Sequence, residues 1–329
     1  MRGTAAAAWL ARRLAAAAAI VFAVVTLTFV IVHLAPGSPF LPGPDHPADP
    51  RLIAELTHRF GLDQPLSTQY LRYLGRLLHG DFGYAFSQGV EVRAALGAVI
   101  PNTLLLAGTA LVLDLLGGLG LALVQAARAR RFTDVALGNA TLFVYSVPTF
   151  WLGLVLVFVF SIWLRWLPPT GTTTPGLYES LPLLGRIGDR LLHLVLPACT
   201  LGLVGAAGTA RYQRAALLET LGRDFIRTAR AKGLADRRIL LGHALRNALL
   251  PFITLLGISL PFLLTGAVLV EDVFAWPGMG RLAMDAVLAR DHTLVTAVAI
   301  VTSTLVVLGS LVADVLYAVA DPRIRSGTP

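Results

Sequence analysis

The residues best suited to chemistry lie in two short motifs, and neither forms a nucleotide site. A P-loop needs Gly-Lys-Ser/Thr, so that the lysine and the hydroxyl can hold phosphate and magnesium. The only lysine in the sequence, Lys232, is flanked by Ala231 and Gly233, so this motif is absent. The run from Gly278 to Ala283 has the letters of a dinucleotide fingerprint, but it lacks the preceding buried strand and the βαβ unit. We interpret this run as a tight turn, and we expect the chain to hydrolyse no ATP itself.

Patterns for hydrolysis or metal binding are also missing from the sequence. There is no Gly-x-Ser-x-Gly elbow and no His-Glu-x-x-His motif. The histidines are scattered, with no pair four residues apart, and Cys199 is the single cysteine. These features argue against a structural metal site and exclude an intramolecular disulfide. We therefore expect the chain to bind no cofactor of its own.

Two carboxylates lie inside long apolar runs, Asp114 and Asp314, where an ionisable group is costly unless it faces protein or water. They can form hydrogen bonds between helices, line a transport path, or bind a coupling ion. The last role suits a secondary transporter driven by an ion gradient, but such proteins usually show internal repeats, and none is visible here. Polar and helix-breaking residues of the fifth apolar run could also bind a passing solute weakly. The residues predicted for a path are Asp114, Thr254, Ser259, Pro261, Thr265 and Asp314.

A basic segment between the fourth and fifth apolar runs, 219–247, has the pattern of two short helices. Asp224 is placed to cap the first helix, and Gly233 is placed to end it in the left-handed conformation. The second helix would start at Asp236 and continue to about Leu249, with one apolar face. Such a segment can lie on anionic lipid, or it can form a rigid knob that fits a groove on a motor subunit.

The composition indicates which elements position these residues. The chain is 56% hydrophobic and 14% charged, whereas a soluble domain carries roughly a quarter charged residues. About 20 apolar residues are needed for a helix to cross a bilayer. We therefore predict an all-α membrane protein with six transmembrane helices, the third kinked at Pro148 and the first retained as a signal anchor. The predicted spans are about 12–34, 101–126, 134–164, 193–213, 248–270 and 294–319.

The arginines predict the orientation of these spans. The net charge is +8, and 17 of the 27 basic residues fall near the termini or beside the loops after the second and fourth spans. By the positive-inside rule, both termini are cytoplasmic. Residues 36–100 and 271–293 would then lie outside. The helix-like stretches 52–60 and 66–78 either lie on the outer ends of the spans or form a docking surface for an external partner.

The segment from Asp224 to Pro251 resembles the cytoplasmic loop of the dipeptide, oligopeptide and nickel ABC importer permeases, and it matches their B-type subunit. Arg227 stands where the general importer signature has an acid, and this departure also resembles the peptide branch. Ala235 stands where a capping serine is expected, so the second helix of the loop would start weakly. Other matching stretches run along nearly the whole chain, among them Gly61-Leu62-Asp63-Gln64-Pro65, Gly80-Asp81-Phe82-Gly83 and Trp276-Pro277-Gly278-Met279-Gly280-Arg281.

The resemblance implies a single permease domain over residues 1–329, in the bacterial inner (cytoplasmic) membrane, with a cytoplasmic coupling helix between spans four and five. Its partners would be a second homologous permease, two ATPase subunits that hold ATP and magnesium, an extracytoplasmic substrate-binding protein and membrane lipid, with no nucleic acid. The loop would dock the ATPase subunits. The coupling residues implied by the resemblance are Asp224, Arg227, Ala229, Lys232, Gly233, Leu234, Arg237, Arg238, Leu241, His243, Arg246 and Asn247.

The cargo of such an importer could be a di- or oligopeptide or nickel, and the sequence favours the peptide. Nickel in a dehydrating path would favour imidazole, thiolate or thioether ligands. The predicted spans offer few of these: Cys199 is alone, Met279 and Met284 lie in the external region, and His33 and His193 lie near outer span ends. A membrane scaffold without transport is a third class of function, but it would not need the cytoplasmic knob.

Overall fold

The computed structural model describes residues 2–34, 58, 63–249, 252, 259 and 267–320, and these residues are mainly helical, as predicted. The two short strands form one antiparallel hairpin, with Tyr84 opposite Glu91 and Ala85 opposite Val90. The elements in chain order are α1 (Arg2–Leu34), α3 (Leu66–Leu78), β1 (Tyr84–Ala85), β2 (Val90–Glu91), α4 (Val92–Ala127), α5 (Phe132–Ser146), α6 (Thr149–Leu156), the π-helix η1 (Val157–Trp163), the 3₁₀ turn η2 (Tyr178–Ser180), α7 (Leu183–Leu221), α8 (Asp224–Ala231), α9 (Asp236–Arg238), the π-helix η3 (Ile239–Ala244), α11 (Val268–Val273), α12 (Met279–Leu288) and α13 (His292–Ala320).

Four of the described helices are long and apolar enough to cross a membrane. The candidate spans are Ala11–Ile31, Val92–Ala127, Leu183–Leu221 and His292–Leu316. A fifth is added if the bent pair formed by α5 and α6–η1 counts as one span. The fifth predicted span, 248–270, falls largely outside the described residues, as does the predicted helix 52–60. The described part of the chain therefore supports four or five spans.

Helix α4 and helix α7 extend beyond the predicted spans. Helix α4 begins at Val92 rather than at Pro101, and α7 occupies 183–221 rather than 193–213. Hydropathy detects only the most apolar turns, whereas tertiary packing stabilises the remaining ones. Val92 is fully buried in a cluster with residues of α12 and α13, and Leu217 is fully buried beside Ala122 and Ala244.

The third predicted span, 134–164, is two helices rather than one kinked helix. Helix α5 ends at Ser146, and the axis turns by 105° before η1 ends at Trp163. Val147 adopts an extended conformation, with φ −79° and ψ 135°, because the ring of the following Pro148 disfavours helical geometry there. Pro148 was correctly predicted to disturb this span, but the bend is a complete break in the helix.

The centre of the molecule is the packing of α4 against α7. Small residues allow their backbones to approach closely. A Cβ atom on Gly205 would lie 2.7 Å from the Asp114 carboxylate, and one on Gly118 would lie 2.6 Å from Thr209. Leu106 and Leu201 are buried nearby with Phe274 and Trp276 in one apolar cluster.

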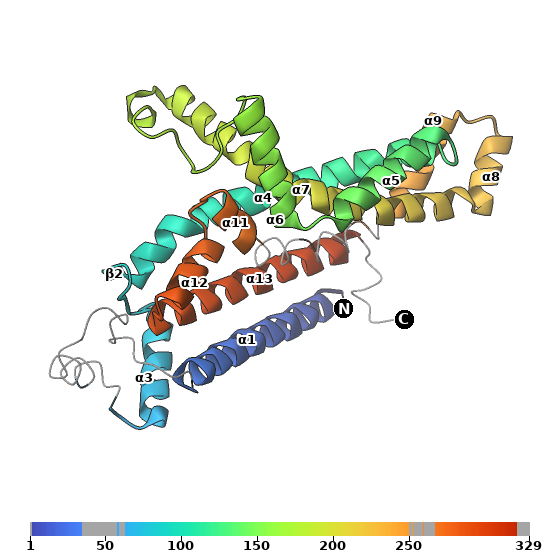
Figure 1. Ribbon diagram of the computed structural model, residues 1–329. Helices are drawn as coiled ribbons and strands as arrows, with labels where there is room; N and C mark the ends of the chain where they lie inside the picture. Colours follow the sequence, from blue (N-terminus) through green and yellow to red (C-terminus); the bar gives the residue numbers. More distant parts are fainter. Residues whose placement is uncertain are drawn as a thin grey trace.

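The two ends of the elongated molecule have different structures (Figure 1). Helix α3, the hairpin and α12 lie at one end, and α8 and α9 lie at the other, beyond the start of α1 and the end of α13 (Figure 1). The hairpin is joined to α13 through Asp291, whose Oδ2 accepts hydrogen bonds of 2.9 Å from both the backbone N–H and the hydroxyl of Ser87. Helix α3 matches the predicted range 66–78 and contacts α1, where Thr26 and Tyr70 hydroxyls are 2.6 Å apart.

Candidate functional site

The basic segment after α7 folds as a helix, a tight turn and a second helix. Helix α8 ends in a Schellman motif: Gly233 N–H donates to the Arg230 carbonyl at 2.9 Å, and Leu234 N–H donates to the Ala229 carbonyl at 3.3 Å. Gly233 has φ +75°, the left-handed conformation that its position in the sequence predicts. The buried side chain of Ile226 in α8 packs in one apolar cluster with Ile239 of the second helix.

The start of α8 differs from the prediction. Arg223, in an extended conformation, is the N-cap residue, and its side chain makes no capping hydrogen bond. Asp224 is the first helical residue, and its carboxylate accepts a 3.2 Å hydrogen bond from exposed Arg227. A carboxylate in the first turn still interacts favourably with the helix dipole, so Asp224 supports the helix without capping it.

The second helix of the segment starts at Asp236 after Ala235, which provides no side-chain cap, as its residue type predicts. It passes through the π-helix η3 before regular helix resumes over 245–249. Ile239 and Ala244 of η3 are buried, Leu240 and His243 are partly buried, and Leu241 and Gly242 are exposed. A π-bulge of this kind often occurs at functional positions.

The structure separates the twelve predicted coupling residues into two groups. Ala229 is buried in the small core between α8 and η3, and Leu234 and His243 are partly buried. These three support the shape of the segment. The other nine are exposed and form its outer surface: Asp224, Arg227, Lys232, Gly233, Arg237, Arg238, Leu241, Arg246 and Asn247.

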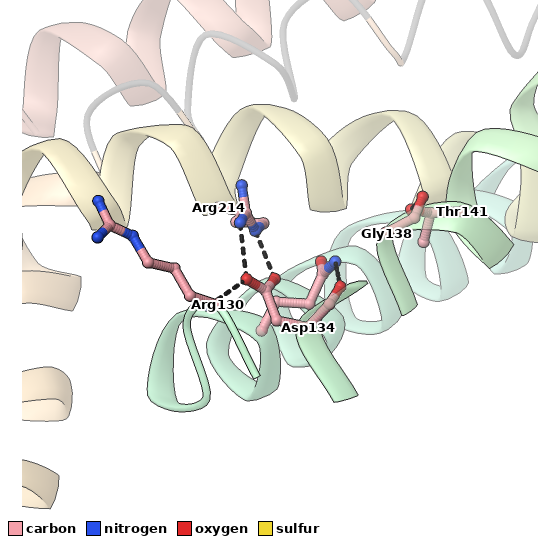
Figure 2. A network of polar contacts seen from close by, with 6 residues as sticks. Arg130, Asp134, Gly138, Thr141 and Arg214 are labelled. Atoms are coloured by element: carbon pink, nitrogen blue, oxygen red, sulfur yellow. Dashed lines mark hydrogen bonds and ion pairs between the residues drawn. The ribbon is translucent and has the colours of Figure 1, made fainter. Parts of the chain in front are cut away.

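An ion pair that sequence spacing does not reveal joins α7 to α5 just before this segment (Figure 2). Arg214 donates to both carboxylate oxygens of Asp134, at 2.7 and 2.8 Å, and Arg130 N–H donates to the same carboxylate at 2.8 Å. The Asp134 side chain is only 2% exposed. The available signal was an acid at the start of an apolar run and an arginine at the end of another, but sequence spacing alone does not show that the two meet.

The residue beside Arg214 connects α7 in another direction. With its amide oriented to match its surroundings, Gln213 donates to the Ala248 carbonyl at 3.0 Å and accepts from Phe252 N–H at 2.9 Å. Gln213 is fully buried. Consecutive residues of α7 therefore contact the helix that follows η3, through Gln213, and α5, through Arg214.

The predicted path residues fall in three different environments. Asp114 accepts a 2.6 Å hydrogen bond from Thr209 on α7, and the Ser259 hydroxyl also bonds to its carboxylate. Asp314 on α13 instead pairs with Arg13 on α1, at 3.0 Å. Thr254, Pro261 and Thr265 lie outside the described residues. The structure thus brings Asp114 and Ser259 together and leaves Asp314 apart from them.

A second buried carboxylate organises the region around Trp276 and Gly278. Glu271 is fully buried, and its two oxygens accept from the Thr103 hydroxyl at 3.1 Å and from Arg281 N–H at 2.9 Å. Burial raises the pKa of Glu271 above its ordinary value, and these hydrogen bonds act in the opposite direction. The run from Gly278 to Ala283, predicted as a tight turn, is the N-cap and first residues of α12. The Glu271 carboxylate on α11 accepts hydrogen bonds from the Gly280 and Arg281 N–H groups at this helix start.

Comparison with known proteins adds evidence from outside the structure. The family described as "Binding-protein-dependent transport system inner membrane component" matches residues 118–326, and the corresponding N-terminal family matches residues 7–107. The oligopeptide transport system permease protein AppB of Bacillus subtilis is 38% identical, over 97% of this chain and 99% of its own length. The di/tripeptide permease protein DppB of Pseudomonas aeruginosa is 39% identical, over 96% and 98%.

Similar relations extend to other proteins. The dipeptide permease protein DppB of Escherichia coli strain K12 is 35% identical, over 91% of this chain and 93% of its own length. Among solved structures, an inward-facing form of the MetNI methionine ABC transporter matches with a TM-score of 0.55 and 18% identity, covering 70% of this chain and 97% of that chain. At this identity the match establishes the fold, which is that of an ABC transporter permease.

Proposed function

Because the chain belongs to the family of binding-protein-dependent transport system inner membrane components, we propose that it moves di- or oligopeptides inward as one permease subunit of an ATP-driven importer. The observation that carries the choice of cargo is the similarity over nearly the whole chain to permeases named for peptides, at 35–39% identity. The poor supply of nickel ligands in the predicted spans supports the same choice over nickel.

We further propose that the whole chain is one domain with six spans and cytoplasmic termini, with 36–100 and 271–293 outside. The arginine distribution supports this orientation. The start of α1, the end of α13 and helix α8 also lie toward the same end of the molecule, as expected if all three are on the cytoplasmic side (Figure 1). Cysteines introduced at Gln88, in the hairpin, and at Ser326 should then react with impermeant reagents from opposite sides. Reaction of both from outside would refute the orientation.

The segment 219–247 is the part of the chain proposed to dock the ATPase subunits. Its support is physical: a small buried core of Ile226, Ala229 and Ile239 makes it rigid, and its outer surface is rich in arginine. A rigid projecting helix fits the helix-in-groove mode of recognition. ATP and magnesium would be held by two partner ATPase subunits, since this chain has no P-loop. The remaining partners would be a second homologous permease, an extracytoplasmic substrate-binding protein and lipid.

The translocation path is proposed to pass near Asp114 and Ser259, with Thr254, Pro261 and Thr265 nearby in the sequence. The contact between Asp114 and Ser259 supports a shared location for the first two. Asp314 has a different proposed role, because its ion pair with Arg13 links the first and last described helices. An ion-coupled mechanism would need this chain to transport without ATPase subunits.

The experiment that tests this function is purification of the assembled complex with its ATPase subunits and binding protein. We expect ATP hydrolysis to rise several-fold when the binding protein is loaded with a di- or oligopeptide. Nickel should give no such increase. A complex stimulated by nickel and not by peptides would refute the cargo, and a chain that transports without ATPase subunits would refute the class of transporter.

A further inference from the structure

Arg211 and Tyr145 form a contact between α7 and α5 that the proposed function does not use. The guanidinium carbon of Arg211 lies 5.6 Å from the centre of the Tyr145 ring. The same ring packs beside Gly208, where a Cβ atom would lie 3.2 Å from it. Both side chains are exposed, Tyr145 by 53%. The pair therefore lies in the α5–α7 seam and faces outward from it.

Arg211 lies two residues before the end of the predicted span 193–213, but α7 continues ten residues beyond Arg211, to Leu221, so the pair lies inside a helix long and apolar enough to span a membrane. Tyr145 is near the far end of α5, roughly 20 Å from Phe132 at about 1.5 Å per residue. Because the predicted third span begins at about residue 134 and the apolar core of a bilayer is about 30 Å thick, Tyr145 lies well inside the predicted membrane region. Helix α4 gives an independent measure of the depth of Arg211. Asp114 lies roughly 20 Å along α4 from its end at Ala127, and it bonds to Thr209, which is close to Arg211 in α7.

The Arg211 side chain points away from the predicted cytoplasmic surface. Helical side chains lean toward the N-terminus of their helix, and the contact with the Tyr145 ring at Gly208 shows that Arg211 does so. An arginine that faced lipid would instead extend its charge toward the nearer interface. Arg214, one turn away, has Asp134 as its partner, but no carboxylate of the described residues pairs with Arg211.

A charged group at this depth is costly unless it faces water or a partner charge. We propose that Arg211, beside Tyr145, is an anion-binding site in the water-filled translocation path, and that its ligand is the carboxylate of a peptide in transit. The ring contacts the guanidinium and leaves N–H groups available, and a guanidinium binds a carboxylate through two parallel hydrogen bonds. This inference rests on the proposed peptide cargo.

The test measures water access and charge at the site directly. In a Cys199→Ala chain carrying Tyr145→Cys, assembled with its partners in liposomes, we expect an anionic methanethiosulfonate reagent to react about tenfold faster than a cationic one. Adding Arg211→Gln should abolish this preference, whereas Arg211→Lys should keep it. Absence of reaction with both reagents, or a preference that survives Arg211→Gln, would overturn the proposal.

A transport measurement separates this inference from the proposed function. Uptake of alanyl-alanine by the wild-type complex tests the function alone. If the wild type transports it, Arg211→Gln should reduce the uptake rate about tenfold while peptide-stimulated ATP hydrolysis stays within about twofold, and Arg211→Lys should restore most of the uptake. Unchanged uptake by Arg211→Gln would contradict the site and leave the peptide importer intact.

Discussion

Arg214 on α7 donates two hydrogen bonds to the carboxylate of Asp134 on α5, and the two partners differ in their access to solvent. The Asp134 side chain is 2% exposed, whereas the Arg214 side chain is 35% exposed. The buried carboxylate therefore needs the arginine to compensate its charge, whereas the arginine can also be solvated by water.

Removal of the Arg214 side chain should therefore lower the stability of the fold more than removal of the Asp134 side chain. Arg214→Ala leaves the buried carboxylate without its counter-charge and with only the Arg130 N–H as partner, which costs about 3 kcal/mol. Asp134→Ala should cost about half as much, because Arg214 can still reach polar surroundings. The thermal midpoints of the purified variants measure the difference. Arg223→Ala, which removes an exposed pair with Glu219, is the matched control and should cost below about 0.5 kcal/mol. Equal losses for Arg214→Ala and Asp134→Ala would contradict this account.

Gly205 should not tolerate a large side chain. Its Cβ position lies 2.7 Å from the Asp114 carboxylate, so Gly205→Leu must separate α4 from α7, and even Gly205→Ala should cost about 2 kcal/mol. We expect Gly205→Leu to lower the yield of assembled complex at least several-fold. Gly188→Leu, on the same helix with open space around its Cβ position, serves as control. A normal yield of the Gly205→Leu complex would show that the close approach is not required.

Gly233 should be required for coupling and not for insertion. Its φ of +75° disfavours a β-branched residue, although nothing lies within 4 Å of its Cβ position. Gly233→Val should insert normally but lose most peptide-stimulated ATP hydrolysis and uptake, and Gly233→Asn should retain more because asparagine tolerates the left-handed region. Gly242→Ala, which has open space and no positive φ, is the control. Wild-type uptake by Gly233→Val would contradict the role assigned to the segment 219–247.

Glu271 should make stability depend on pH. Burial raises the pKa of Glu271 in the folded protein above the ordinary value of 4.5, so folding favours the protonated carboxyl group. This contribution to the free energy of unfolding is fully present below pH 4.5 and is lost as the pH rises through the raised pKa of the folded protein. The thermal midpoint of the wild type should therefore fall with pH relative to that of Glu271→Gln. Parallel curves for the two proteins between pH 4.5 and pH 8 would contradict this expectation.

The local features of the fold were predictable because they depend on neighbouring residues. The left-handed Gly233, the helix over 66–78 and the disturbance at Pro148 all follow from conformational preferences that act within a few residues. The range of α4 was predicted less well, because its first turns are stabilised by contacts with α12 and α13 that sequence periodicity does not reveal.

The buried polar contacts were not predictable for the same reason. Asp134 and Arg214 lie far apart in sequence, as do Ser87 and Asp291, and each pair requires the tertiary fold to bring it together. Asp114 was singled out because an acid in an apolar run is unusual, but only the structure identifies Thr209 as its partner. Chemical type thus pointed to individual residues, and the fold supplied their partners.

Transport of peptides by this family member is tested by peptide uptake into liposomes that contain this chain, its partner permease and the two ATPase subunits. With the binding protein and a labelled di- or oligopeptide outside and ATP inside, the account predicts saturable accumulation that requires ATP and binding protein and that unlabelled peptides inhibit. Uptake without ATP, or saturable nickel uptake that no di- or oligopeptide inhibits, would contradict it.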